Sequence, residues 1–392
     1  MDERSYFDHA ASSPVVPGVT DAVRAVLEEG WGNPSSAHFE GRRARRRIDE
    51  ARESVAALVG CEPGDVVFTS GGTESNALAV GGMLAAADPG APLVLSTVEH
   101  SSVSRLAERA ADAGRAVLHV GVSREGELDL AALDRALQSK PGLVSIMSAN
   151  NETGTIFPIE EIAARCRAAN APLHSDAVHC LGKSETPLAR LGADALSLSA
   201  HKIGGPQGAG AVILGKCVAI KDVLGAGNHE RGLRGGTENL PGIVGFGVAA
   251  RYWTENGESL RGHLRETGHA VRAILAAIEG AQILAEGAPG YASTCSVMVG
   301  GISGEALLQA LDLEGISVSM GAACSSGALE PSKPLQGMGY AREEAASAVR
   351  FSVGWNTSAE DVTRLGRILP AIVERLRGAG RARQQRLNRA SG

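Results

Sequence analysis

A lysine follows a strand-like run in SLSAHKIGGPQGAGAVIL, residues 197–214. The alternating residues 195–198 predict a strand, and after Lys202 the chain enters a loop with four glycines and a proline. A lysine at the end of a buried strand is costly unless its amine is paired or chemically committed. Because a lysine can also extend its amine to water from such a place, this stretch alone leaves both interpretations open.

Three other stretches place reactive groups at predicted strand ends. FTSGGTESNALAV puts two glycines and Thr73 between a strand and a helix. The amides and positive dipole end of a helix N-terminus suit a phosphate, although the same residues also form an ordinary turn that Thr73 caps. HSDAVH supplies Asp176, and VEHSSV supplies His100. An inward-facing carboxylate at a strand end needs a cationic partner.

These residues together match the chemical needs of pyridoxal phosphate. Its aldehyde needs a lysine for a Schiff base, its pyridine nitrogen needs a carboxylate that keeps it protonated, and its ring needs a flat group to stack on. Asp176 precedes Lys202 by 26 residues, after the glycine turn and His100. We therefore predict that Lys202 is committed to this cofactor.

The elements that must position these residues alternate between strands and helices. We predict strands at 65–70, 92–97, 116–120, 143–150, 172–176 and 195–200, and helices at 74–87, 101–113, 129–139 and 158–170. This alternation predicts an α/β fold with a mostly parallel sheet, helices on both faces and sites at the C-terminal ends of the strands.

The pattern changes after a predicted helix at 242–256. A long helix at 259–280 follows, then strands at 294–300, 316–321 and 348–354 and helices at 304–315 and 360–378. We predict a large cofactor-binding domain at 15–256, and a smaller α/β domain made of 1–14 and 257–392.

Composition narrows the classes of function. The net charge of −6 provides no overall field for nucleic acid or an anionic membrane. The arginine-rich stretches 41–54 and 374–392 favour a solvated helix face and a frayed terminus. With no apolar window of about 18 residues, we expect no membrane association and a cytoplasmic location. The six cysteines lack CxxC spacing, which favours reduced thiols over a zinc site or disulfides.

Ten motifs distributed almost from end to end make the chain similar to a known family. They are YFDHAASSPV, GNPSSAH, FTSGGTES, EHSSV, NNETG, HSDAVH, SLSAHKIGGPQGAG, ERGLRGGTEN, GAACSSGALEPS and VRFSVG. With them the chain resembles the cysteine desulfurases, which are fold-type-I pyridoxal-phosphate enzymes of the class V aminotransferase group, and especially their nitrogen-fixation and iron–sulfur branch. The resemblance implies a mostly parallel, seven-stranded sheet in the large domain and a smaller α/β domain.

The resemblance also implies roles for individual residues. Lys202 would carry the cofactor and remove the substrate's α-proton, and His100 would stack on the ring and carry protons. The other implied roles are holding the phosphate (Gly72, Thr73, Ser199, His201), pairing the ring nitrogen (Asp176), contacting substrate and ring oxygen (Asn151), binding the substrate carboxylate (Arg350) and reaching the phosphate of the other subunit (Thr237). The last role implies a homodimer with shared sites.

Cys324, in GAACSSGALEPS, is by its small neighbours alone a candidate for a buried structural thiol. The resemblance instead places it on the family's mobile catalytic loop. It implies that L-cysteine becomes L-alanine while Cys324 takes the sulfur as a persulfide, for transfer to an acceptor such as an iron–sulfur scaffold.

Three alternatives remain at this point. A class V aminotransferase or kynureninase-like hydrolase would keep Asp176 and Lys202 without needing Cys324, and selenocysteine lyase is hard to separate by sequence. A purely scaffolding protein is disfavoured, because every matched chemical residue is present.

One residue departs from the family pattern. His179 stands where the family usually has a glutamine that donates a hydrogen bond to the ring's phenolic oxygen. A neutral imidazole can donate one such bond, whereas a protonated one would strengthen the bond and shift the titration of the bound cofactor. Our hypothesis is the protonated form, with the neutral form as the alternative.

Overall fold

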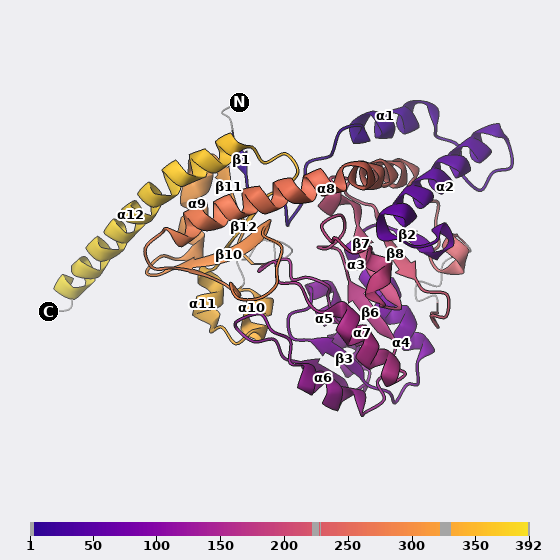
Figure 1. The fold of residues 1–392 in the computed structure, drawn as a ribbon, viewed down its shortest axis with the longest axis horizontal. Coiled ribbons are helices and arrows are strands. Elements are labelled where there is room, and N and C mark those ends of the chain that lie inside the picture. The colour runs from indigo at the N-terminus through magenta and orange to yellow at the C-terminus, as the bar shows by residue number, and fades with distance from the viewer. Residues whose placement is uncertain (1–3, 222–226, 228, 322–330, 391–392) are drawn as a thin grey trace.

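The computed structural model describes residues 4–221, 227, 229–321 and 331–390, with side chains up to residue 379 (Figure 1). A seven-stranded sheet with the order β2-β8-β7-β6-β5-β3-β4 forms the centre of the larger lobe. All its strands run in one direction except β8, which is antiparallel to both neighbours. The strands are β2 (Val66–Thr69), β3 (Leu93–Ser96), β4 (Val117–Val120), β5 (Leu143–Ser145), β6 (Leu173–Asp176), β7 (Ala195–Ser199) and β8 (Gly210–Leu214).

Successive residues of the strands enter separate hydrophobic cores, because side chains along a strand alternate between the two faces of the sheet. Phe68 and Ile213 pack into the core under α1 (Val19–Glu29), α2 (Phe39–Val59) and α8 (Leu240–Ala276). Val67 and Val212 pack into the opposite core, under α5 (Ser101–Asp112) and the helical run α3 (Gly72–Asn76), η2 (Ala77–Gly81) and α4 (Gly82–Ala86). The predicted α/β fold is therefore confirmed.

A third core lies on the same side as the first, where Val94 and Val144 pack with α6 (Leu130–Leu137) and α7 (Ile159–Ala168).

All six strands predicted for this part of the chain are present. The seventh, β8, is not among the predicted strands. Its first residue, Gly210, is the last of the four glycines that indicate a loop after Lys202. Its residues are all buried, which is typical of a central strand covered on both faces.

The smaller lobe contains the antiparallel sheet β12-β10-β9 and a two-stranded parallel sheet, β1-β11. Its strands are β1 (Ser5–Tyr6), β9 (Ala281–Ile283), β10 (Thr294–Val299), β11 (Ile316–Ser317) and β12 (Val349–Ser352). Its helices are α9 (Gly304–Leu313), α10 (Lys333–Gly337), α11 (Arg342–Ser347) and α12 (Ala359–Ala390). Pairing of Ser5 with Ile316 brings the N-terminal strand into this lobe. The strand expected at 316–321 is shorter than predicted, and the last helix is longer.

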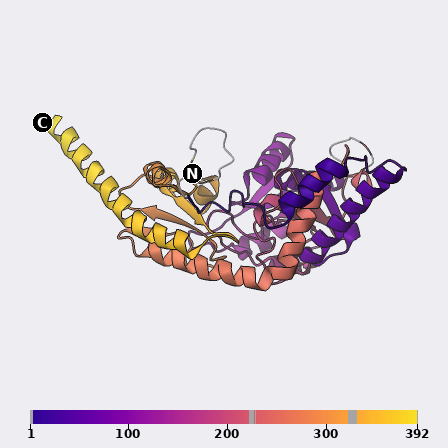
Figure 2. The same ribbon diagram turned by 90° about the horizontal axis from the view of Figure 1, so that it is seen from above.

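Helix α8 connects the two lobes. It is one continuous helix of 37 residues, where the sequence predicted two. Figure 2 shows it running along both lobes. The proposed domain boundary at residues 256–257 therefore lies inside a helix, and the domain limits stay a proposal. Among the described residues, the helices are all too short or too polar to span a membrane.

Candidate active site

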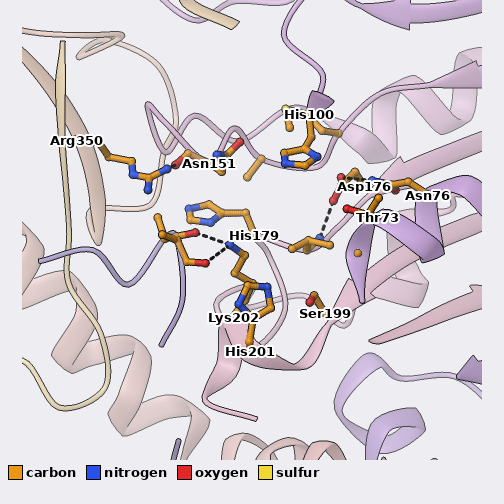
Figure 3. A pocket seen from close by; sticks show the side chains of 16 residues that line it. Thr73, Asn76, His100, Asn151, Asp176, His179, Ser199, His201, Lys202 and Arg350 are labelled. Atoms are coloured by element: carbon orange, nitrogen blue, oxygen red, sulfur yellow. Dashed lines mark hydrogen bonds between the residues drawn. The ribbon is translucent and has the colours of Figure 1, made fainter. Parts of the chain in front are cut away.

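A cavity of about 160 Å³ lies at the C-terminal ends of the parallel strands (Figure 3). It gathers side chains from the sheet, from the N-terminal segment and from β12. The predicted site residues that line it are Gly72, Thr73, His100, Asn151, Asp176, His179, Ser199, His201, Lys202 and Arg350. Of the described residues that the sequence singled out, Thr237 alone lies outside this cavity, with an exposed side chain.

The turn after β2 forms a cradle bounded by glycines. Gly71 has a φ of +150°, a backbone conformation that residues with a side chain rarely adopt. The helical run through α3 and α4 begins at the next residue, Gly72. A Cβ on Gly210 of β8 would lie 2.6 Å from Gly71 Cα, so the unpredicted strand packs directly against this turn. The helix N-terminus and the side chains of Ser199 and His201, which line the same cavity, provide donors for an anionic group.

Asp176, the last residue of β6, accepts two hydrogen bonds in this pocket. Asn76 Nδ2 donates to its Oδ2 at 2.7 Å, and the amide of Val178 donates to its Oδ1 at 3.0 Å. Sequence reasoning missed Asn76. It stands four residues after Gly72 in the same helical run, a spacing that places both on one helix face and could have identified it.

His100 caps the N-terminus of α5 and belongs to the same network. Its Nδ1 accepts from the amide of Ser102 at 3.2 Å and lies 2.7 Å from the Ser102 hydroxyl. That hydroxyl in turn accepts from Asn76 Nδ2 at 2.8 Å. With Nδ1 serving as an acceptor, the network assigns the ring proton to Nε2.

Lys202 lies in the 3-10 turn η4 (Ala200–Ile203), directly after β7. Its Nζ donates to the carbonyl oxygens of Ala10 and Ala11 at 2.6 and 2.8 Å (Figure 3). Sequence reasoning did not identify these carbonyls as part of the site, because they lie more than 190 positions away. They orient the lysine amine at the wall of the cavity.

Arg350 reaches the cavity from β12 and is almost fully buried. Its Nη2 pairs with Asp8 Oδ1 at 2.8 Å, and its Nη1 donates to the carbonyl of Asn151 at 3.2 Å. The Nε has no partner among the described residues. A buried guanidinium with an unsatisfied N–H suits a carboxylate ligand.

The structure corrects the hypothesis for His179. Burial, together with the nearby cations Lys183, Lys202 and Arg350, holds the pKa of His179 well below its usual value. The ring is therefore neutral at physiological pH, which is the alternative stated above. Its Nε2 lies 3.2 Å from Thr294 Oγ1 and its Nδ1 lies 3.4 Å from Lys183 Nζ.

Comparison with known proteins places this arrangement in a family. The model of the aminotransferase class-V family matches residues 5–365. The chain belongs to this family. A cysteine desulfurase from Cereibacter sphaeroides is 40% identical over 96% of this chain and 97% of its own length.

Two solved structures share the fold. A NifS-like protein superposes with a TM-score of 0.89 at 32% identity, covering 95% of this chain and all of that one (100%). A structure described as SspA in complex with cysteine has a TM-score of 0.79 at 28% identity, covering 90% of this chain and 100% of its own.

The class-V family implies pyridoxal phosphate, and the residues of this pocket fit that group. The glycine cradle suits its phosphate, Asp176 suits its pyridine nitrogen, and Lys202 suits its aldehyde.

Cys324 lies outside the described residues. Ser332, just after the undescribed stretch that contains Cys324, hydrogen-bonds the buried carboxyl of Glu152, next to Asn151. Burial raises the pKa of Glu152.

Proposed function

We propose that this chain is a pyridoxal-phosphate-dependent cysteine desulfurase, which converts L-cysteine to L-alanine and holds the sulfur as a persulfide on Cys324. The observation that carries the proposal is the single cavity shared by Lys202, Asp176 and Arg350. These three groups are what an amino acid substrate and this cofactor require together. The name of the relative from Cereibacter sphaeroides supports the choice of substrate.

When bound, pyridoxal phosphate supplies an electron-accepting ring that makes the α-proton of an amino acid acidic. Arg350 binds the substrate carboxylate with its buried guanidinium, in competition with Asp8 for Nη2. The Lys202 amine removes the α-proton, and the Nε2 proton of His100 is available for donation inside the pocket. Asp176 stays oriented by Asn76 throughout.

The transfer of sulfur balances without an external oxidant. The thiolate of Cys324 attacks the substrate sulfur, so that an S–S bond forms while the substrate C–S bond breaks. One L-cysteine and one enzyme thiol thus become one L-alanine and one enzyme persulfide. An acceptor protein, such as an iron–sulfur scaffold, then takes the terminal sulfur.

The enzyme works as a homodimer in the cytoplasm. Support for the dimer comes from Thr237, which is exposed on this chain and lies outside its own cavity. Support for a reducing compartment comes from the described cysteines, which are free thiols (Cys61, Cys166, Cys180, Cys217, Cys295).

The proposal is tested by incubating the purified protein with pyridoxal phosphate and L-cysteine, and measuring alanine and persulfide. Lys202→Ala should stop alanine formation. Cys324→Ser should still bind cofactor but form no persulfide, whereas Cys217→Ser, at an exposed thiol, should behave as wild type. Full alanine production by Cys324→Ser would identify another thiol as the acceptor, and failure of the wild type to bind the cofactor would refute the proposal. Selenocysteine in a parallel reaction tests the lyase alternative.

A further inference from the structure

A second lysine stands behind the cavity and has no part in the chemistry described above. Lys183 lies seven residues after Asp176, in the turns that follow β6. Its Nζ is 3.4 Å from Nδ1 of His179, a residue that lines the cavity. The opposite ring nitrogen, Nε2, is 3.2 Å from the hydroxyl of Thr294 in β10. The imidazole is thus held between a lysine of the large lobe and a threonine of the small lobe.

The groups around Lys183 come from several elements. Burial, together with the nearby cations Lys202 and Arg350, lowers the pKa of Lys183 to about 7, against the opposing effect of Cys180. The other titratable groups that interact with Lys183 are His9 and His179, each with a lowered pKa. Tyr291 packs its ring edge-on against His179 and hydrogen-bonds Cys180.

The chemistry of the two nitrogens makes this contact directional. An ammonium group has only donors, so charged Lys183 can interact favourably with Nδ1 only when Nδ1 carries a lone pair. The single proton of the neutral ring must then lie on Nε2, where the Thr294 hydroxyl can accept it. A neutral amine has a lone pair as well as donors, and therefore tolerates either tautomer.

We propose that Lys183 is a positioning residue that locks His179 in the tautomer with its proton on Nε2. The lock makes Nε2 a donor rather than an acceptor. Its proton faces Thr294 Oγ1 in this structure, and an anionic oxygen of a ligand at this side of the cavity would compete with that hydroxyl for it. This consequence for ligand binding rests on the proposed function, but the tautomer itself is a property of the protein alone.

The decisive measurement is the tautomer of His179 by nitrogen NMR, on cofactor-free protein labelled with ¹⁵N-histidine. The His179 signals are assigned by their loss in His179→Gln. At about pH 6, where Lys183 is charged, the wild type should show a protonated Nε2 and a bare Nδ1. Lys183→Met should show a mixture of both tautomers, while the exposed control Lys216→Met should match the wild type. A single Nε2–H tautomer in Lys183→Met, or a protonated Nδ1 in the wild type, would overturn the proposal.

Two further arms keep the test independent of how well one variant folds. In the wild type, raising the pH from about 6 to about 9 neutralises Lys183 and should release the same mixture; an unchanged tautomer over that range contradicts the lock. Thr294→Val removes the hydroxyl but keeps the shape, and the Nε2–H tautomer should persist at the lower pH. Its loss there would assign the lock to Thr294 instead.

Binding of pyridoxal phosphate to the cofactor-free protein provides the link to function. Lys183→Met should weaken binding about three- to tenfold, the effect of one perturbed hydrogen bond. In a His179→Gln background the same substitution should have less than about a twofold effect, because a residue that acts through another loses its influence when that other is removed. Equal effects in both backgrounds would show that Lys183 acts on the ligand directly. Since the NMR arm needs no cofactor, its result stands even if the proposed function is wrong.

Discussion

At the residue scale, a chain of hydrogen bonds ties two walls of the cavity together. Asn76 donates both to Asp176 and to the Ser102 hydroxyl, which contacts His100. One amide therefore orients the carboxylate that we propose pairs with the cofactor nitrogen and, through Ser102, the imidazole across the cavity. Such a network is more sensitive to loss of a single member than the count of its bonds indicates.

We predict that Asn76→Ala lowers kcat/KM for cysteine about 10- to 100-fold. The substitution removes a donor from buried Asp176, and one lost hydrogen bond to a charged group is worth about 1.5–3 kcal/mol. The measurement is steady-state alanine formation. Asn256→Ala, at an exposed asparagine of α8, is the matched control and should be unaffected. Activity of Asn76→Ala within about twofold of wild type would contradict the role given to this amide.

Glu99 is a second residue whose state the structure decides. It is buried beside His100, where its Oε1 accepts from Ser96 and from the amide of Met147 at 2.9 Å, while Oε2 has no partner among the described residues. Burial raises its pKa to about 8. The carboxyl is therefore neutral in the folded protein at pH 7 but ionised in the unfolded chain.

The sign of the pH dependence follows from these two states. Between about pH 4.5 and pH 8 the folded state binds the extra proton, so the contribution of Glu99 to stability falls as the pH rises. Glu99→Gln imitates the protonated acid and removes this dependence. We predict that Glu99→Gln gains about 1–4 kcal/mol over wild type between pH 5 and pH 8, measured by urea unfolding of cofactor-free protein. Exposed Glu127→Gln should show no such gain, and a pH-independent difference for Glu99→Gln would contradict the raised pKa.

At the scale of elements, α8 depends on close approach to its neighbours. A Cβ on Gly247 would lie 2.6 Å from both Cα and Cβ of Ala51 in α2, so the two helices pack with almost no space between their backbones. Gly262 lies further along the same helix. A Cβ on Gly262 would have no heavy atom within 4 Å. The same substitution should therefore have opposite effects at the two positions.

We predict that Gly247→Ala destabilises the protein by about 1–3 kcal/mol, because overpacking forces α2 and α8 apart. Gly262→Ala should stabilise it by about 0.5–1 kcal/mol, because alanine is the better helix former in open space. Urea unfolding of both variants is the measurement. If Gly262→Ala is less stable than wild type, or Gly247→Ala is as stable as wild type, the helix packs differently from this structure.

At the scale of the whole molecule, the surface around Thr237 carries exposed apolar side chains. Ser35 Oγ lies 3.3 Å from His229 Nε2, and Arg45 pairs with Glu238 at 2.9 Å, so the segment 31–45 adjoins the segment that carries Thr237. Three large apolar side chains in or near this segment are exposed: Leu27, Trp31 and Phe39. Exposed apolar groups beside a polar site favour a docking surface for a second copy of the chain.

Subunit mixing tests whether the sites are shared. Lys202→Ala and Thr237→Ala chains should each be nearly inactive alone, and each heterodimer should contain one intact site. We predict recovery of about a quarter of wild-type activity after random exchange, because half of the dimers are then mixed and half of their sites are complete. Exchange is verified by mass, with unexchanged chains as the control. No recovery despite verified exchange would mean that Thr237 serves its own subunit or no site.

The sequence by itself determined the alternation of strands and helices and the places of Asp176, His100 and Lys202 after strands. It could do so because periodicity and turn chemistry are local, and because parallel strands bring their C-terminal ends to one edge. The motifs of the family added Arg350 and Asn151, which no local pattern connects to that edge. Ten of the predicted residues accordingly meet in one cavity.

Only the tertiary structure decided which groups complete this cavity. Lys202 donates to the carbonyls of Ala10 and Ala11, and Arg350 pairs with Asp8. These partners lie 191 to 342 residues away along the chain. The charge of His179 likewise depends on its burial among Lys183, Lys202 and Arg350, whose distances no spacing encodes. These hydrogen bonds and pKa shifts are set by the packing of remote segments and by the exclusion of water, so both arise only once the chain has folded.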